Sequence, residues 1–381
     1  MAAPPYRFCG CASRPAERGF MCMDRGPENP AAGRPAPHRG AGSNPPNRFE
    51  PLRLERDEDW KPEEDPLPRT VFLKDRSQSI ITFNDSPDVG FAAGINPYRG
   101  CEHGCIYCYA RPTHEYLGFS AGLDFETKIM VKERAAELLR KELSSPKWRP
   151  QPLGMSGVTD CYQPVERKLK ITRGCLEVLA EFRNPVNIVT KNSLVTRDID
   201  LLSELAKNRA ASVCISVTSL DPDLRGVLEP RTSPPTARLT AIRQLSGAGI
   251  PVGVLVAPVI PGLTDHEIPG ILEAAAQAGA SFAGWEMLRL PYSNQELFEH
   301  WLEQHFPEKK DKVLGRIRAV RGGKLNDSHF GSRMRGEGMF AEQMAQMFQV
   351  AARKAGLPGV GPVLSTAAFL TPTGAQLDLE L

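Results

Sequence analysis

Short apolar runs rich in β-branched residues alternate with helical patterns through the middle of this chain of 381 residues. The runs predicted as strands are 79–83, 153–158, 186–190, 211–217, 252–259 and 282–288. The helices predicted between them are 132–143, 171–182, 199–206, 236–247 and 267–277. Continuous apolar strands, rather than alternating ones, are typical of a parallel sheet that is buried on both faces. Repeated βα units with right-handed crossovers form either a doubly wound sheet or a barrel.

The number of βα units selects between these two architectures. About six units follow the segment 94–100, which is fewer than the eight of a complete (β/α)8 barrel. The sequence therefore predicts an α/β fold, a partial (β/α)6 barrel of the TIM type with parallel strands. We assign this barrel to residues 69–295.

The segments on either side of the barrel differ from it in composition. Residues 1–68 are rich in Pro, Gly, Ala and Arg, and we predict disorder because they cannot bury enough apolar surface to offset chain entropy. Residues 296–356 are predicted to form a C-terminal helical cap with a polar, basic loop. Residues 357–381 are rich in Pro and Gly, which predicts a weakly structured tail.

The overall composition places few limits on function. A formal net charge of +2 neither favours nor excludes nucleic acid as a partner. No apolar run approaches the roughly 20 residues of a membrane span, and none near the start has signal-peptide length. An odd total of nine cysteines, with an apparent cluster motif, fits a reducing cytoplasm. The chain could start at Met1, Met21 or Met23.

Three cysteines, Cys101, Cys105 and Cys108, follow the segment 94–100 with three and then two residues between them. Thiolates at this spacing can each hold one iron of a cubane 4Fe–4S cluster, which leaves the fourth iron open to a substrate or cofactor. A closed structural site would need a fourth ligand, and no fourth cysteine stands at a suitable distance in the sequence.

Other interpretations of these cysteines remain open from the residues alone. His103 or His114 could complete a structural zinc site, since zinc accepts mixed Cys and His ligands. A ferredoxin-like electron carrier would also use cysteine ligands, although bacterial ferredoxin runs have two-residue gaps. A disulfide framework is disfavoured because nothing marks the chain as secreted.

The cysteine run, with Tyr107 directly before its last member, resembles that of the radical S-adenosylmethionine (radical SAM) superfamily. Thr159-Asp160 and Lys191 make the chain similar to its spore photoproduct lyase-like branch, over residues 79–335. The resemblance implies a partial barrel, with the fourth iron chelated by SAM. It implies reductive cleavage of SAM to a 5′-deoxyadenosyl radical, which abstracts hydrogen from a substrate. It also implies a reducing electron donor such as a flavodoxin or ferredoxin.

Polar residues after the predicted strands are candidates for binding SAM, because ligands of parallel α/β folds bind at the carboxyl ends of the strands. The candidates are Tyr107, Tyr109, Thr159, Asp160, Lys191, Ser216 and Arg231. Lys191 would suit a carboxylate as a compact charge, or it could be a surface lysine. Arg231 could bind a carboxylate or phosphate, or pair with an acid of the protein such as Glu229. The tyrosines and Ser216 could instead serve only packing and backbone hydrogen bonds.

Two further features bear on the substrate. Cys161 follows the second barrel strand, where a thiol could return a hydrogen atom to a substrate radical, or it could be a small buried apolar residue. The segment 312–335 carries clustered cations with an aromatic, which could bind a nucleic acid, or form a solvated helix face. Three hypotheses therefore stand: a radical SAM enzyme of unknown substrate, a lyase that repairs a DNA photoproduct, and a non-enzymatic iron–sulfur or zinc protein.

Overall fold

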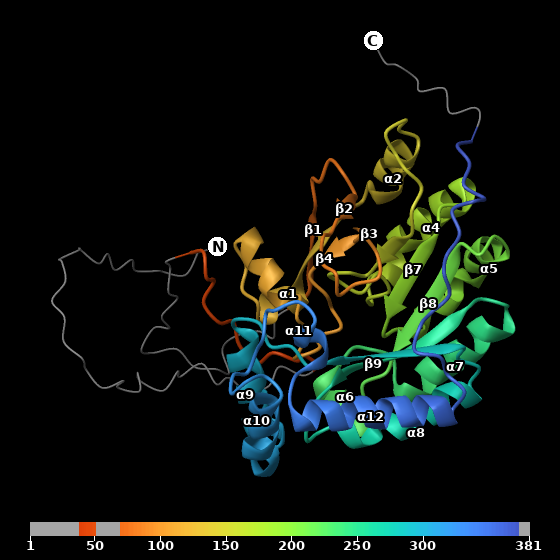
Figure 1. The fold of residues 1–381 in the computed structure, drawn as a ribbon. Coiled ribbons are helices and arrows are strands. Elements are labelled where there is room, and N and C mark those ends of the chain that lie inside the picture. The colour runs from red at the N-terminus through yellow and green to blue at the C-terminus, as the bar shows by residue number, and fades with distance from the viewer. Residues whose placement is uncertain (1–37, 51–68, 373–381) are drawn as a thin grey trace, which may run out of the picture. The chain divides into compact units, whose positions relative to one another are not determined.

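A sheet with six parallel strands forms the centre of the computed structural model, which describes residues 38–50 and 69–372. Its order is β10-β9-β8-β7-β6-β3-β2, in which only β2 runs antiparallel to its neighbour (Figure 1). The strands are β2 (Ile81–Phe83), β3 (Ala93–Ile95), β6 (Leu153–Met155), β7 (Val186–Thr190), β8 (Ala211–Ser216), β9 (Val252–Val259) and β10 (Phe282–Met287). The predicted partial barrel of parallel strands is confirmed.

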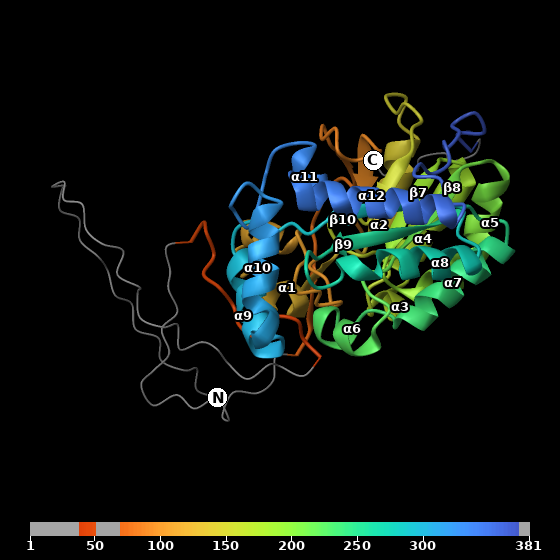
Figure 2. The ribbon, with the colours of Figure 1, turned by 60° about the horizontal axis from the view of Figure 1, so that its bottom comes forward.

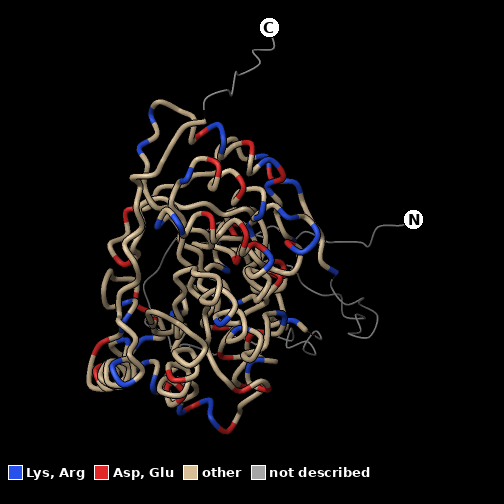
Figure 3. Tube along the Cα trace, turned by 90° about the vertical axis from the view of Figure 1, so that its right-hand side faces the viewer, with Lys and Arg blue, Asp and Glu red and all other residues tan. Residues whose placement is uncertain are grey.

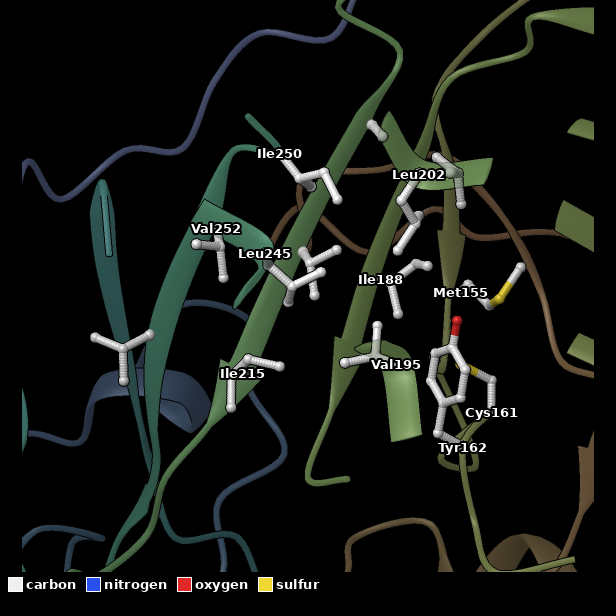
Figure 4. Close-up of a cluster of buried hydrophobic side chains, with 14 of the residues drawn as sticks. Met155, Cys161, Tyr162, Ile188, Val195, Leu202, Ile215, Leu245, Ile250 and Val252 are labelled. Atoms are coloured by element: carbon white, nitrogen blue, oxygen red, sulfur yellow. The ribbon is translucent and has the colours of Figure 1, made fainter. Parts of the chain in front are cut away.

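Helices between successive strands cover the outer face of this sheet (Figures 1 and 2). They are α2 (Ala135–Leu143), α4 (Ile171–Phe182), α5 (Ile199–Lys207), α7 (Pro235–Gly247) and α8 (Ile268–Gln277). Each lies within a few residues of its predicted range. Their apolar sides join the strands in one buried cluster, as Figure 4 shows for Leu202 and Leu245 beside Ile188 and Ile215. Burial at about 25 cal/mol per Å² of apolar surface makes this cluster the main source of stability.

Several short strands and helices are added to the barrel outside its main sheet. A three-stranded sheet, in the order β1-β5-β4, pairs β1 (Val71–Lys74), β5 (Lys128–Val131) and β4 (Tyr98–Arg99). The short helices are η1 (Arg111–Leu117), α1 (Leu123–Thr127), α3 (Glu166–Leu169), η2 (Ser193–Asp198), α6 (Pro222–Leu228), η3 (Asp265–Glu267) and η4 (Pro307–Lys309). The polar loops from which these elements are built gave no clear periodic pattern in the sequence.

The C-terminal helices pack against two different parts of the molecule and do not form a single cap. They are α9 (Asn294–His305), α10 (Lys310–Ala319), α11 (Ser332–Arg335) and α12 (Met339–Lys354). The side chains of Met344 and Phe348 on α12 belong to the barrel core, and α12 lies against α8 (Figure 2). Helices α9 and α10 instead form a second core cluster with the cysteine loop, in which Trp301 of α9 and Ile106 of the loop are both buried. The amphipathic face of α12 therefore extends the helical layer of the barrel.

The two ends of the described chain also pack against the barrel. Residues 38–50, which we predicted to be disordered, lie beside the cysteine loop with Ala41 only 1% exposed. They are held by hydrogen bonds described below; the rest of 1–68 lies outside the described residues. Residues 357–372 form no helix or strand, yet Pro358 O accepts from Ala283 N and Leu370 N donates to Phe182 O. Such backbone contacts order a segment that has little local propensity.

Candidate active site

A cavity of about 240 Å³ opens at the carboxyl ends of the barrel strands. Residues from the cysteine loop and from the ends of β6, β7, β8, β9 and β10 line it, beside Val89 and Phe91. Gly154 on β6 makes room for the Phe91 ring, because a Cβ there would lie 2.5 Å from that ring. The predicted site residues in this lining are Cys101, Cys105, Tyr107, Cys108, Tyr109, Thr159, Asp160, Lys191 and Ser216.

The three cysteines of the motif all face this cavity as free thiols. Burial raises the pKa of Cys101, Cys105 and Cys108, so a thiolate there needs a compensating cation. Among the described residues, no three Cys, His, Asp or Glu side chains converge as ligands of a single metal ion. A cubane cluster does not require that convergence, because each thiolate binds a different iron. The donor set therefore fits a 4Fe–4S cluster.

A buried arginine supports the loop that carries these cysteines. Arg111 Nε donates to Cys105 O (3.0 Å), and its Nη1 donates to Ala121 O (3.1 Å) and Gly122 O (3.0 Å). Its charge is matched by Glu126, and both side chains are fully buried. Because an arginine satisfies several carbonyl groups at once, it fixes a loop that has little regular backbone hydrogen bonding.

Lys191 follows β7 and points into the cavity instead of into solvent. Its Nζ donates to Ser216 Oγ (2.7 Å) and to Ala257 O (2.7 Å), and lies 3.2 Å from both Thr218 Oγ1 and Glu229 Oε1. The side chain is 16% exposed. These contacts hold the ammonium group at the floor of the cavity. The main role of Ser216 at the site is therefore to hold this lysine.

Glu229 is a fully buried carboxylate beneath this floor. It accepts hydrogen bonds from Tyr107 Oη, Arg238 Nη2 and Thr218 Oγ1, the last at 2.6 Å. Burial alone would raise the pKa of Glu229, but Arg238 and Lys191 lower it well below its usual range. Two cations thus surround one carboxylate, which leaves a surplus positive charge beside the cavity.

The residues after β6 brace the site mainly through their own hydrogen bonds. Thr159 Oγ1 donates to Tyr98 O (3.0 Å). Asp160 accepts from Thr190 Oγ1 (2.8 Å) and Lys191 N (2.7 Å), and lies 3.4 Å from His103 Nδ1. Burial would raise the pKa of Asp160, but His103 and these donors lower it. The Thr-Asp pair therefore ties β6, β7 and the cysteine loop together at the cavity wall.

The two tyrosines of the motif have different environments. Tyr107 is buried, and its hydroxyl group ends at Glu229 and Thr218. Tyr109 is 44% exposed and donates to Gly157 O (2.6 Å), so its ring forms part of the cavity mouth. Only Tyr109 therefore presents an accessible aromatic face.

Two predicted site residues lie elsewhere. Arg231 does not line the cavity; its Nη2 lies 3.0 Å from Glu102 Oε1, so its partner is an acid of the cysteine loop. Cys161 is fully buried in the barrel core beside Met155 and Tyr162 (Figure 4). Because Cys161 is not in the cavity lining, the structure does not support its predicted role as a hydrogen donor.

Glu286 and Arg289 were missed by the sequence analysis and line the cavity from the end of β10. Burial raises the pKa of Glu286, although Arg289, Arg335 and Lys191 oppose the shift. Among the described residues, its carboxylate has no hydrogen bond or ion pair. Arg289 Nε is buried without a partner, and the guanidinium lies 5.2 Å from the Tyr109 ring centroid. Glu286 lies at the carboxyl end of the predicted strand 282–288 and Arg289 directly follows it, and this position was the signal available in the sequence.

Most cations of the segment 312–335 make contacts inside the protein. Arg321 donates to Leu288 O (2.6 Å), Arg333 to Asp88 (2.5 Å) and Arg335 to Trp285 O (2.5 Å), while Arg316 covers the Phe340 ring. The exposed cations are Lys312, Arg318, Lys324 and Arg335, of which only Arg335 makes one of these contacts. Lys and Arg occur alongside Asp and Glu along the trace in Figure 3. The structure therefore gives less support to a nucleic-acid surface than the sequence did.

Comparison with known proteins defines the class to which this fold and cavity belong. Residues 95–275 match the model of the radical SAM superfamily. An uncharacterized protein of Methanocaldococcus jannaschii is 30% identical over 219 residues, 58% of this chain and 78% of that protein. An uncharacterized protein of Mycobacterium tuberculosis is 40% identical over 220 residues. The chain spans 65% of the length of this mycobacterial relative.

This chain belongs to the radical SAM superfamily. The enzymes of that superfamily use a 4Fe–4S cluster and SAM, and these are the cofactors of this chain.

Solved structures of spore photoproduct lyase share the fold. A cysteine-to-serine mutant has a TM-score of 0.56 at 17% identity, covering 76% of this chain and 81% of that one. A mutant bound to AdoMet and dinucleoside spore photoproduct has a TM-score of 0.54 at 18% identity, with the same coverage. At this identity the likeness concerns the fold. No helix among the described residues is long and apolar enough to cross a membrane.

Proposed function

We propose that this chain is a radical SAM enzyme that binds a 4Fe–4S cluster through Cys101, Cys105 and Cys108 and cleaves SAM reductively. When bound, the cluster and SAM supply one-electron cleavage of a carbon–sulfur bond, giving methionine and a 5′-deoxyadenosyl radical that abstracts hydrogen from a substrate. The observation that supports this proposal most strongly is the convergence of three thiols and the Lys191 ammonium on one cavity.

The chain's own residues position the cofactor and exclude water. Lys191 offers a fixed positive charge to the SAM carboxylate, and Ser216 and Ala257 O hold that charge in place. Asp160 orients Lys191 by accepting a hydrogen bond from its backbone N–H group. Tyr109 covers the cavity mouth. Exclusion of water from the cavity by its lining side chains would protect a radical from side reactions.

Glu286 and Arg289 face the cavity from the carboxyl end of β10, the last parallel strand, and the Arg289 guanidinium lies near the Tyr109 ring at the cavity mouth. We assign them to the substrate. Arg289 Nε is buried without a partner, which is costly, and the Glu286 carboxylate makes no hydrogen bond among the described residues. A ligand that offers an acceptor to Arg289 and a donor to Glu286 would satisfy both. The electron comes from a reducing partner such as a flavodoxin or ferredoxin, as in the superfamily.

The test is anaerobic reconstitution with iron and sulfide, followed by dithionite and SAM, with 5′-deoxyadenosine quantified. We expect deoxyadenosine from the wild type and none from Cys105→Ala. Cys175→Ala is the matched control, because Cys175 is buried in the core away from the cavity. A protein that binds zinc in place of a cluster, or that holds a cluster and never cleaves SAM, would contradict the proposal in favour of the binding or sensor hypothesis.

A further inference from the structure

The end of α6 and the residues that follow it run beside the cysteine loop and are attached to it by two backbone hydrogen bonds. Ile106 N donates to Leu228 O (3.1 Å), and Arg231 N donates to His103 O (3.2 Å). These two bonds bracket Cys105 on the cysteine loop. The segment 228–231 therefore constrains the backbone on both sides of the middle cysteine.

Side chains strengthen the same attachment. Arg231 Nη2 lies 3.0 Å from Glu102 Oε1, and the Glu102 side chain is only 4% exposed. The other Glu102 oxygen accepts from Val165 N (2.7 Å), and Glu102 N donates to Gln163 Oε1 (2.9 Å). Glu102 directly follows Cys101 in the chain. A nearly buried carboxylate thus stands next to the first cysteine, and Arg231 is its only ion-pair partner among the described residues.

The position of this pair separates it from the cofactor cavity. Neither Arg231 nor Glu102 lines the cavity, so the pair does not touch a molecule bound there. Arg231 acts on the cluster site through the backbone of the loop and through its charge. Breaking the pair leaves this buried carboxylate with only the Val165 N–H group and the charge of Arg39 to compensate it, which is costly.

We propose that Arg231 is a positioning residue for the iron–sulfur cluster, which it holds in place by pairing with Glu102 and bracing the loop around Cys105. The inference rests on the proposed function, because it assumes that these cysteines bind a cluster. Two consequences follow from it. Loss of Arg231 loosens the loop, so iron is released faster. It also removes a cation that offsets the Glu102 charge beside Cys101, which disfavours an added electron, so the reduction potential becomes more negative.

The experiment uses the full chain, reconstituted anaerobically, in wild-type, Arg231→Gln and Arg231→Lys forms. Iron release to a chelator and the midpoint potential are measured without SAM. We expect Arg231→Gln to release iron about fivefold faster, the factor for a part-exposed ion pair worth about 1 kcal/mol. Its potential should shift to a more negative value. Arg231→Lys should restore most of both properties, since lysine keeps the charge.

A double-mutant cycle identifies the partner. In the Glu102→Gln background, Arg231→Gln should speed iron release little further, because the ion pair is already broken. Arg243→Gln is the matched control, since Arg243 is exposed on α7. Wild-type behaviour of Arg231→Gln in both measurements, or full additivity of the two substitutions in iron release, would overturn the inference.

The outcome for this inference is separable from that for the proposed function. A wild type that holds a cluster but yields no deoxyadenosine contradicts SAM cleavage and leaves the role of Arg231 measurable. A wild type that holds no 4Fe–4S cluster contradicts both.

Discussion

Arg111 and Glu126 form an ion pair in which neither side chain is exposed to solvent, with Arg111 Nη2 2.5 Å from Glu126 Oε1. Arg111 binds carbonyl groups of the cysteine loop, while Glu126 accepts hydrogen bonds from the backbone N–H groups of Gly40 (3.0 Å) and Ala41 (2.8 Å). Residues 38–50 and the cysteine loop are thus attached to opposite ends of one pair. Glycine is required at position 40, because a Cβ there would lie 1.8 Å from Gly104 O.

We expect Glu126→Gln to lower the free energy of unfolding by about 3–5 kcal/mol, since it leaves the Arg111 charge buried without compensation. Denaturant unfolding under anaerobic conditions measures this. Glu137→Gln is the control, because Glu137 pairs with Arg134 in solvent, where an ion pair contributes little to stability. An equal loss in both variants would show that burial of the Arg111 pair has no special weight.

Lys191→Met should weaken SAM binding by at least about tenfold, which corresponds to 1.4 kcal/mol, because it removes the cavity-floor charge. Isothermal titration calorimetry on the reconstituted protein measures the Kd. The iron content is measured alongside, and the Kd is taken per bound cluster, because the Lys191 charge also favours the thiolates of Cys105 and Cys108. Lys168→Met, an exposed lysine on α3, should bind SAM normally. Unchanged affinity in Lys191→Met would assign the lysine to internal neutralisation of Glu229 alone.

Glu286→Gln should be stabilising at neutral pH. Burial raises the pKa of Glu286 above its ordinary 4.5, so the folded state favours the protonated carboxyl. Its contribution to stability is therefore present at low pH and is lost as the pH rises through and above 4.5. We expect the variant to match the wild type near pH 4 and to gain about 1 kcal/mol at pH 7.5.

Denaturant unfolding at the two pH values tests the Glu286 prediction, with Glu273→Gln as an exposed control. A loss of stability at pH 7.5 in Glu286→Gln would mean that the ionised carboxylate has a stabilising partner inside the protein.

The barrel could be predicted because its signals are local. Apolar runs and helical spacing recur along the sequence, and the rule that parallel strands bind ligands at their carboxyl ends brought Lys191 and Ser216 into one cavity with the cysteines. The same rule applied to the sixth strand would have found Glu286 and Arg289.

The remaining features depend on pairs distant in sequence. Glu126 binds Ala41 across 85 residues, and Arg231 binds Glu102 on a loop more than a hundred residues earlier. The composition of residues 38–50 predicted disorder because composition carries no information about hydrogen-bond partners that are distant in sequence. The packing of α12 on the barrel is likewise a tertiary choice, since an amphipathic face indicates burial without naming the surface that covers it.

Cys161→Ala should leave both SAM cleavage and the product unchanged, because the thiol lies in the core and outside the cavity. Its cost is structural, about 1 kcal/mol for a small buried truncation. Deoxyadenosine yield and unfolding free energy are the two measurements. A changed product with normal deoxyadenosine would return Cys161 to the role of hydrogen donor and would require the loop after β6 to move.

His114 makes the neighbourhood of the cysteine loop sensitive to acid. It lies on η1, where its Nε2 donates to Lys128 O (3.0 Å) and its buried Nδ1 has no partner. Burial lowers the pKa of His114 from 6.5 to about 4. The hydrogen bond to Lys128 O and the charge of Asp124 oppose this shift, and the Lys128 ammonium reinforces it. The folded state therefore holds the neutral ring, and the stability that this confers is present above pH 6.5.

Because the unfolded chain binds the proton first, that stability is lost as the pH falls from 6.5 towards 4, on the order of 3 kcal/mol in all. Denaturant unfolding at pH 7.5, 5.5 and 4.5 should show a steeper acid loss for the wild type than for His114→Gln, which keeps a donor for Lys128 O and cannot titrate. His266→Gln, with its ring 74% exposed, should retain the wild-type slope. Equal slopes in all three proteins would exclude His114 as the acid-sensitive group and leave the buried carboxylates to account for the loss.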